Sequence, residues 1–174
     1  MADTLTVDIK ASLHWLYQDA LDLANVTDTA RLEYARTIND GVAVDQADKL
    51  WHDQRTLASG ASDNLDLTSL TNTVFDSTVT VSFARVKALL IVNLATTPNE
   101  DLAVGGAGSG ANGWYAPFKG DADARVVVAA DSTLLWINKK HGWTVIDGVS
   151  DVLKITNDGL ANVTYKIAIV GASS

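Results

Sequence analysis

The sequence of 174 residues contains no cysteine and only two prolines. A chain without cysteine forms no disulfide bond, no thiolate zinc site and no cysteine nucleophile. It has no apolar run near the ~20 residues that a membrane-spanning helix needs. Its N-terminus lacks the basic start and the apolar stretch of a secretory signal peptide. We therefore expect a protein that is made in the cytoplasm and that crosses no membrane.

Positive charge is also scarce. The 13 lysines and arginines stand against 21 aspartates and glutamates, so the formal net charge is −8. Most of the imbalance lies in residues 1–72, which carry 12 acidic and 5 basic residues. Nucleic acids and anionic membranes bind proteins through clusters of lysine and arginine, and the sequence has no such cluster. We expect neither of them as a partner.

The composition favours β structure. Glu33 and Glu100 are the only glutamates, and all other acidic residues are aspartates. Aspartate is common in caps and turns, whereas glutamate is common inside helices. Valine and threonine, which are abundant here, favour strands. A chain of this length buries about 70% of its unfolded surface, enough for one globular domain without disulfides or metals.

Residues 1–58 are predicted to form an N-terminal arm or anchoring segment of mixed structure. The alternation of apolar and polar residues in Leu5–Ile9 predicts a short strand. A short helix is predicted next, capped by Ser12, because apolar residues then recur at helical spacing. These residues are Leu13, Leu16, Tyr17, Ala20, Leu21 and Ala24.

The rest of the arm has two interpretations. Apolar residues alternate with polar ones up to Ile38, and the turn signal Asn39–Gly41 follows, so that 31–44 is predicted to form a hairpin. A helix over 29–38 remains an alternative. The next apolar residues fit one further helical turn: Ala47, Leu50 and Trp51.

Residues 59–72 are predicted to be a polar connector, and residues 73–174 an antiparallel β-sandwich. Short runs of strand-forming residues recur closely there and are separated by turn residues. Asn157–Gly159 stands between two such runs and predicts a hairpin. The spacing is typical of a jelly-roll-like sandwich. The predicted strands are 79–83, 86–92, 101–104, 125–129, 134–137, 143–146, 152–156 and 163–169.

No motif in the sequence points to catalysis. The glycine-rich stretch Gly105–Gly113 lacks the features of a phosphate-binding loop, so we expect a surface loop that is free to order against a partner. The three histidines lack the close spacing of paired zinc ligands; they are His14, His52 and His141. No aspartate pair fits a calcium loop, and no nucleophile elbow is present. We predict no enzyme, no cofactor and no metal site.

Five tryptophans are many for this length. Trp136 and Trp143 lie in predicted strands and are expected in the core. The aromatic residues after the glycine loop form either a contact surface or a plug at the end of the sandwich. Trp15 and Trp51 are expected to pack on a neighbouring subunit. The candidate contact residues are Leu5, Val7, Ile9, Trp15, Trp51, Trp114, Tyr115 and Phe118.

Several segments together resemble a group of small virion structural proteins of tailed bacteriophages. The segments are Gly41–Leu57, Asp63–Leu67, Phe83–Asn93, Asp151–Asn157 and Tyr165–Gly171. They carry a pattern of strand and turn residues with no catalytic signature, and no functional residue can be transferred from them. The resemblance implies a particle component without enzymatic activity. Its first expectation is a head decoration (cement) protein, a type that commonly forms homotrimers where capsid subunits meet.

Three hypotheses follow. The first is a capsid cement protein that binds the major capsid protein on the outer surface of the head, a location that suits the negative charge. The second is a tail-tip or fibre protein that binds a host receptor or glycan through Trp114 and Tyr115. The third is an enzyme, which requires a pair of carboxylates in a cleft.

Overall fold

The computed structural model describes residues 4–20, 24–74 and 77–174. Nearly all of the regular structure in these ranges is β, and the sheets are antiparallel apart from one short parallel pair. The helical part of the described residues consists of two 3-10 turns, η1 (Ser109–Ala111) and η2 (Ala116–Phe118). This confirms the prediction of a mainly β chain.

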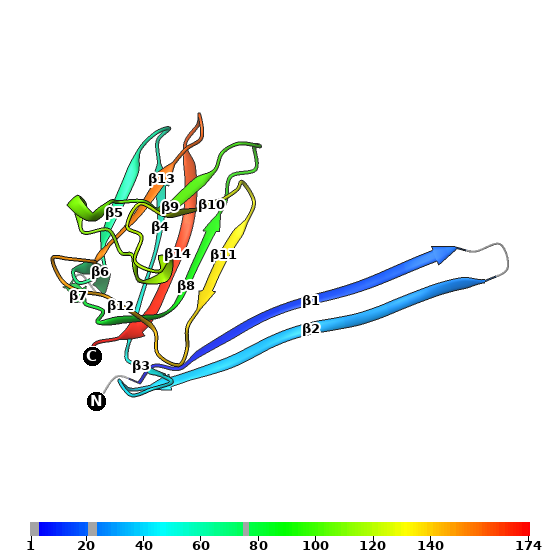
Figure 1. Cartoon of the computed structure of the whole chain (residues 1–174), viewed down its shortest axis with the longest axis horizontal. Coiled ribbons are helices and arrows are strands. Elements are labelled where there is room, and N and C mark those ends of the chain that lie inside the picture. The colour runs from blue at the N-terminus through cyan, green and yellow to red at the C-terminus, as the bar shows by residue number, and fades with distance from the viewer. Residues whose placement is uncertain (1–3, 21–23, 75–76) are drawn as a thin grey trace.

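The body of the molecule contains two sheets (Figure 1). One has the strand order β10-β9-β13-β5, and the other has the order β11-β8-β14-β4, with β12 pairing β8. Their bounds are β4 (Lys49–Leu57), β5 (Ser62–Asp66), β8 (Arg85–Asn93), β9 (Leu102–Gly105), β10 (Arg125–Val128), β11 (Thr133–Ile137), β12 (Trp143–Thr144), β13 (Val152–Asn157) and β14 (Val163–Ala172).

One hydrophobic cluster joins the two sheets. Alternate residues of β8 and β14, such as Ile91 and Ile169, point into it, and so do Val104 of β9 and Ile155 of β13. All four of these side chains are completely buried. The small hairpin of β6 (Leu70–Val74) and β7 (Ser77–Val81) packs at the edge of the same cluster.

A long two-stranded ribbon, which we call the arm, projects from the body (Figure 1). It consists of β1 (Val7–Ala20) and β2 (Asn25–Asp40), paired without a break from Val7 opposite Ile38 to Ala20 opposite Asn25. The short β3 (Gln46–Ala47) runs parallel to the end of β2 and leads into β4.

The arm corrects three predictions for the N-terminal segment. The helix predicted after Ser12 is wrong, because these residues are strand β1; Leu21, part of that predicted face, lies outside the described residues. The hairpin predicted over 31–44 is wrong as well, because β2 continues straight to Asp40. The helical turn predicted around Ala47, Leu50 and Trp51 is wrong too, because these three residues lie in β3 and β4. The strand predicted over Leu5–Ile9 is confirmed from Val7 onward, where β1 begins, and its partner is β2.

The physical reason is the partner strand. Residues 7–20 contain apolar residues at both helical and strand spacing, and the sequence alone does not reveal that residues 25–38 can pair with them. Pairing with the next strand gives the backbone groups on the inner edges a partner, whereas an isolated short helix is marginal in water. Long-range pairing therefore decides the local structure.

The sheets also cross the predicted domain limits. Strand β4 lies within 1–58 and β5 within 59–72, yet both are members of the body sheets. The projecting part ends near Asp40, where β2 ends.

The turn at Asn157–Gly159 joins β13 to β14, which belong to different sheets, so the hairpin predicted there is wrong. Asn157 is completely buried. Its Nδ2 donates to the backbone oxygens of Leu57 at 3.0 Å and Ala161 at 2.8 Å, and its Oδ1 accepts from the Gly159 N–H at 2.8 Å. The asparagine therefore satisfies the backbone where the chain crosses from one sheet to the other.

Replacing Asn157 with alanine is expected to lower the free energy of unfolding by about 3 kcal/mol, because several buried backbone groups lose their partner. Urea unfolding followed by tryptophan fluorescence measures the change. The matched control is Asn162→Ala, since Asn162 is exposed, and it should change the stability by less than about 0.5 kcal/mol. Equal effects of the two substitutions would contradict this role.

Candidate functional site

The two faces of the arm differ sharply in polarity. Residues directly opposite each other in an antiparallel pair share a face, and alternate residues along a strand lie on opposite faces. We call the two sides the apolar face and the polar face. The apolar face carries Val7, Ile9, Ala11, Leu13, Trp15, Tyr17 and Asp19 of β1 with Val26, Asp28, Ala30, Leu32, Tyr34, Arg36 and Ile38 of β2. The polar face carries Asp8, Lys10, Ser12, His14, Leu16 and Gln18 of β1 with Asn25, Thr27, Thr29, Arg31, Glu33, Ala35 and Thr37 of β2.

Most of the apolar face is uncovered. The side chains of Leu13, Tyr17 and Leu32 are each about two-thirds exposed, at 64%, 65% and 68%. From Lys10 to Asp19 every residue of β1 is exposed. A two-stranded ribbon has no second layer and is marginally stable in water without one. An exposed apolar stripe of this length is a candidate interaction surface.

Polar contacts along the arm connect its strands. The Trp15 Nε1–H donates to Asp28 Oδ2 at 3.2 Å, and the Thr37 hydroxyl donates to Asp8 Oδ1 at 2.7 Å. These side-chain contacts across the ribbon hold the register that separates the two faces.

The base of the arm is fixed to the body by a second hydrophobic cluster. Ile9 and Ile38 of the apolar face pack there with Ala88 of β8 and Val170 of β14. Ile38 is completely buried. Three partly buried residues pack around this cluster: Leu5, Val7 and Tyr34. The carboxylate of Asp40, at the end of β2, accepts the Leu5 N–H at 3.1 Å. The apolar face therefore begins in a packed core and continues beyond it uncovered.

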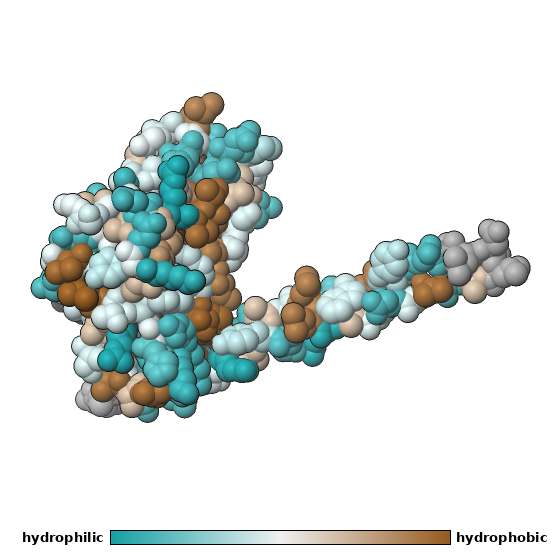
Figure 2. Space-filling view, viewed as in Figure 1, coloured by the Kyte–Doolittle hydropathy of each residue, from teal (hydrophilic) through white to brown (hydrophobic). Residues whose placement is uncertain are grey.

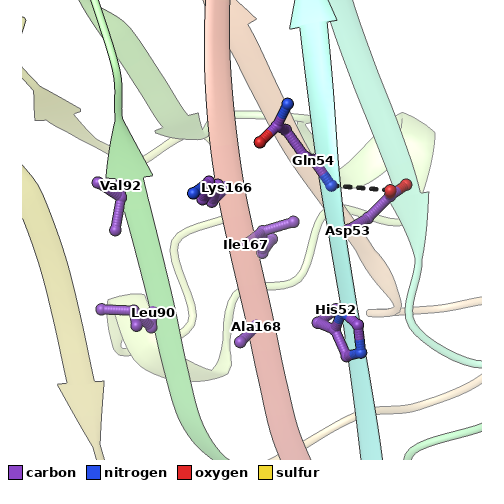
Figure 3. Close-up of a pocket in the computed structure, with 8 residues that line it drawn as sticks. All are labelled: His52, Asp53, Gln54, Leu90, Val92, Lys166, Ile167 and Ala168. Carbon is purple, nitrogen blue, oxygen red and sulfur yellow. Dashed lines mark hydrogen bonds between the residues drawn. The ribbon is translucent and has the colours of Figure 1, made fainter.

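The body presents a complementary surface, which we call the sheet face: the side of β11-β8-β14-β4 that points away from the main core. Its apolar residues are Ala88, Leu90, Val92, Leu135, Ile137, Ala168 and Val170. Two shallow grooves lie along it and share Leu90 and Ala168. Figure 3 shows the part farther from the arm, between β8, β14 and β4. In Figure 2, hydrophobic residues lie both along the arm and on the side of the body toward it.

The exposed groove is lined by one base, Lys166, and one acid, Asp53. Lys166 and His52 line it on β14 and β4 and are both exposed, and Gln54 lies beside them. The nearby Asp53 carboxylate is paired with the Arg55 Nε at 2.9 Å. The groove therefore has an apolar floor with unpaired positive charge at Lys166.

The candidate contact residues of the sequence fall into different environments. Trp15 lies on the apolar face of the arm, 38% exposed, whereas Leu5, Val7 and Ile9 lie at its base. Trp51 and Trp114 belong to the core of the body, where their Nε1–H groups donate to the backbone oxygens of Thr71 and Thr144. Neither indole forms a contact surface.

The aromatic residues after the glycine loop pack with two tryptophans of the body. Phe118 meets Trp136 edge to face at 5.4 Å between ring centroids, and Trp143 links Trp136 to Trp114. Tyr115 and Phe118 are both partly buried. Trp136 and Trp143 pack against the core as predicted.

The glycine loop is folded on itself. The Gly108 N–H donates to the Ala122 oxygen at 2.9 Å, and its carbonyl accepts the Gly113 N–H at 2.9 Å. A side chain at Gly113 would collide with this backbone. The loop therefore places Trp114 in the core.

Two partly buried titratable groups, Tyr165 and Lys87, have shifted pKa values. Tyr165 donates to Asp63 Oδ2 at 2.7 Å, and burial together with that contact raises the pKa of Tyr165. Burial lowers the pKa of Lys87, whose Nζ donates to the Lys140 oxygen at 3.0 Å. Both groups are committed to structural partners.

Within residues 4–20, 24–74 and 77–174, no group of histidines and acids is arranged to hold a metal ion. The same part of the chain contains no helix with the length and hydropathy of a membrane span.

Sequence reasoning did not select Leu13 and Leu32 as candidate contact residues, and it did not identify the sheet face. The signal for the arm was present, because apolar residues recur at every second position from Val26 to Ile38 apart from Asp28 and Arg36. The sheet face gives no such signal, because Val86–Val92 is apolar on both sides and resembles a fully buried strand.

Comparison of the chain with protein-family models, with curated proteins and with solved structures gives no match. Its function is therefore inferred from its own geometry and sequence.

Ile38→Ala is expected to loosen the arm from the body by about 2–4 kcal/mol, because a completely buried side chain is truncated where two elements meet. Hydrogen exchange should become faster at Val7–Ile9 and near Val170 while the core of β13 stays protected. The control is Ile146→Ala, since Ile146 is 43% exposed. Unchanged exchange at the arm base would show that this cluster does not anchor the arm.

Proposed function

We propose that this chain is a structural protein of a tailed-phage virion, a decoration protein that binds and stabilises the assembled head shell. The observation that carries the proposal is the arm, a long ribbon with one uncovered apolar face on a body that has its own complete core. A protein that works alone gains nothing from such a surface, which is costly in water. A protein that joins a larger assembly covers it.

The body is proposed to be a jelly roll. Its strands alternate between the sheets in the order β4, β5, β8, then β9 and β10, then β11, β13 and β14. Taken in chain order, the eight strands form the two four-stranded sheets 1-8-3-6 and 2-7-4-5, each adjacent pair antiparallel. This order is the one expected of two interlocked Greek keys, an architecture that is frequent among viral capsid domains.

The charge and chemistry of the chain support this role. A net charge of −8 suits the outer surface of a particle filled with DNA. The buried titratable groups are used for structure, as Tyr165 and Lys87 show. The resemblance of Phe83–Asn93 and Tyr165–Gly171 to small virion proteins points the same way. These two segments are the central strands of the sheet face.

The proposed partners are the major capsid protein and further copies of this chain, most simply as a homotrimer seated where capsid subunits meet. The arm offers a route to the shell besides its apolar face. Among the described residues, β1 pairs with β2 alone, so its other edge carries unpaired backbone groups over Val7–Ala20. An exposed edge of this kind accepts a strand from a partner.

Cryo-electron microscopy of intact particles from the phage that encodes the chain tests the location. Density on the head lattice at three-fold or quasi-three-fold positions is expected. Density at the tail tip alone would instead favour binding to a host receptor. Absence from every particle would contradict a virion role and return attention to enzymatic activity.

Purified protein added to heads stripped of it is expected to raise their thermal transition and to bind saturably. The stabilisation follows from binding to the native shell alone and amounts to about 2.7 kcal/mol per site at a hundredfold excess over Kd. Calorimetry of stripped and restored heads measures it. Unassembled capsid subunits are the control and should not bind. Equal heat resistance of both kinds of head would contradict a cement function.

A further inference from the structure

Two apolar surfaces remain open in this one chain, and they belong to the same packing system. At the arm base, the apolar face already lies on the sheet face, where Ile9 and Ile38 contact Ala88 and Val170. Beyond that cluster the apolar face continues along the arm, and the sheet face continues through Leu90 to Val92. The chain therefore shows how one surface packs on the other.

The arm cannot complete this packing within its own chain. The arm leaves the body as a long ribbon that diverges from it, so that its tip lies far from the body (Figure 1). The residues of β1 from Lys10 to Asp19 are all exposed, and Leu90 is 37% exposed on the sheet face. Beyond the arm base, the apolar face of the arm and the sheet face of the body are therefore both uncovered within one chain.

We propose that the apolar face of the arm lies on the sheet face of a second copy of this chain, so that each copy gives one arm and receives one. The inference deepens the proposed assembly function by naming the surface that the arm occupies. Contacts of this head-to-tail kind close into a ring, and a mutual exchange closes a dimer.

Charge complementarity favours a second copy as the occupant. The outer half of the apolar face carries two acids, Asp19 and Asp28, and no base. The outer half of the sheet face carries the base Lys166 with His52 beside it, and the carboxylate that lines the same groove, Asp53, is paired with Arg55. With the apolar residues in contact, the acidic end of one arm meets the basic end of the next groove, and opposite potentials of this kind set the register of an interface.

The exposed stretch of β1 from Lys10 to Asp19 is long enough to cover the open part of the sheet face. The arm base already occupies β14 at Val170, which leaves the seven residues from Val163 to Ile169 open, whereas the exposed stretch of β1 has ten residues. At about 3.4 Å per residue, ten residues span about 30 Å. The polar face and the outer edge of β1 remain available for the shell.

The arm provides a matched pair of variants. Leu32 lies on the apolar face and is 68% exposed, whereas Leu16 lies on the polar face and is 59% exposed. Leu32→Asn is expected to weaken self-association at least about tenfold, because an amide is buried without a partner. Leu16→Asn should leave it unchanged. Sedimentation velocity over a concentration series measures both, and circular dichroism melting checks that the body remains folded.

The sheet face has its own pair. Leu90→Asn is expected to weaken self-association as Leu32→Asn does, whereas Leu160→Asn, at a 92% exposed site between β13 and β14, should not. An equimolar mixture of the Leu32→Asn and Leu90→Asn chains should restore a complex of one chain of each kind. One chain keeps its groove and the other keeps its arm, so a single interface forms.

Because the chain contains no cysteine, cross-linking can locate the contact. Chains with Leu32→Cys and Leu90→Cys together should be joined between copies by a short bismaleimide. Chains with Leu32→Cys alone should not, unless two arms lie face to face. Cross-linking by Leu32→Cys alone, with no effect of Leu90→Asn, would overturn the proposal in favour of arm-to-arm packing.

The outcomes separate this inference from the proposed function. A wild-type chain that is monomeric at all concentrations but decorates heads through its arm would overturn the arm exchange and leave the decoration function intact. An exchanged oligomer that is found on no particle would do the reverse.

Discussion

A two-stranded ribbon can bury one side of itself only against something else, and this constraint governs the molecule. The body of the chain buries its own apolar residues, because two sheets face each other across a continuous core. The arm has no second layer of its own, and only the residues at its base, among them Ile9 and Ile38, pack on the body. Beyond the base its apolar residues are exposed. The proposed assembly role is the direct consequence of that unbalanced geometry.

The body, in turn, is built to hold the arm at a fixed place. Asn157 ties the crossing between β13 and β14 to the end of β4. Strand β14 lies between β8 and β4 and contributes Val170 to the cluster under the arm. Buried hydrogen bonds of this kind fix one arrangement of the strands more than they add stability. The arm therefore leaves the body at a defined point.

Sequence reasoning predicted the β class and nearly every strand after residue 79, because turn residues separate them and each strand is short. It failed where structure depends on distant partners. Residues 12–20 fit a helix and a strand equally well until residues 25–33 are known to pair with them. Asn157–Gly159 has the composition of a hairpin turn, yet its neighbours enter different sheets. Trp114 follows a glycine loop that resembles an exposed contact loop, but the folded loop turns the indole inward.

The two parts of the chain also differ in how far apart their paired residues lie in the sequence. In the arm, Ala20 pairs with Asn25, which follows it closely in the sequence. Strand β4 pairs with β14, so that Leu57 has the distant Val163 as its partner. Local hairpins form in microseconds, and distant pairings form far more slowly. During synthesis the arm leaves the ribosome before the strands of the body and is complete long before β14, the last strand of the sheet face, exists. Each new chain thus passes through a period in which the apolar face of its arm is exposed and its own sheet face has not yet formed. The carboxylates of Asp19 and Asp28 beside its apolar residues would then act as gatekeepers against premature aggregation.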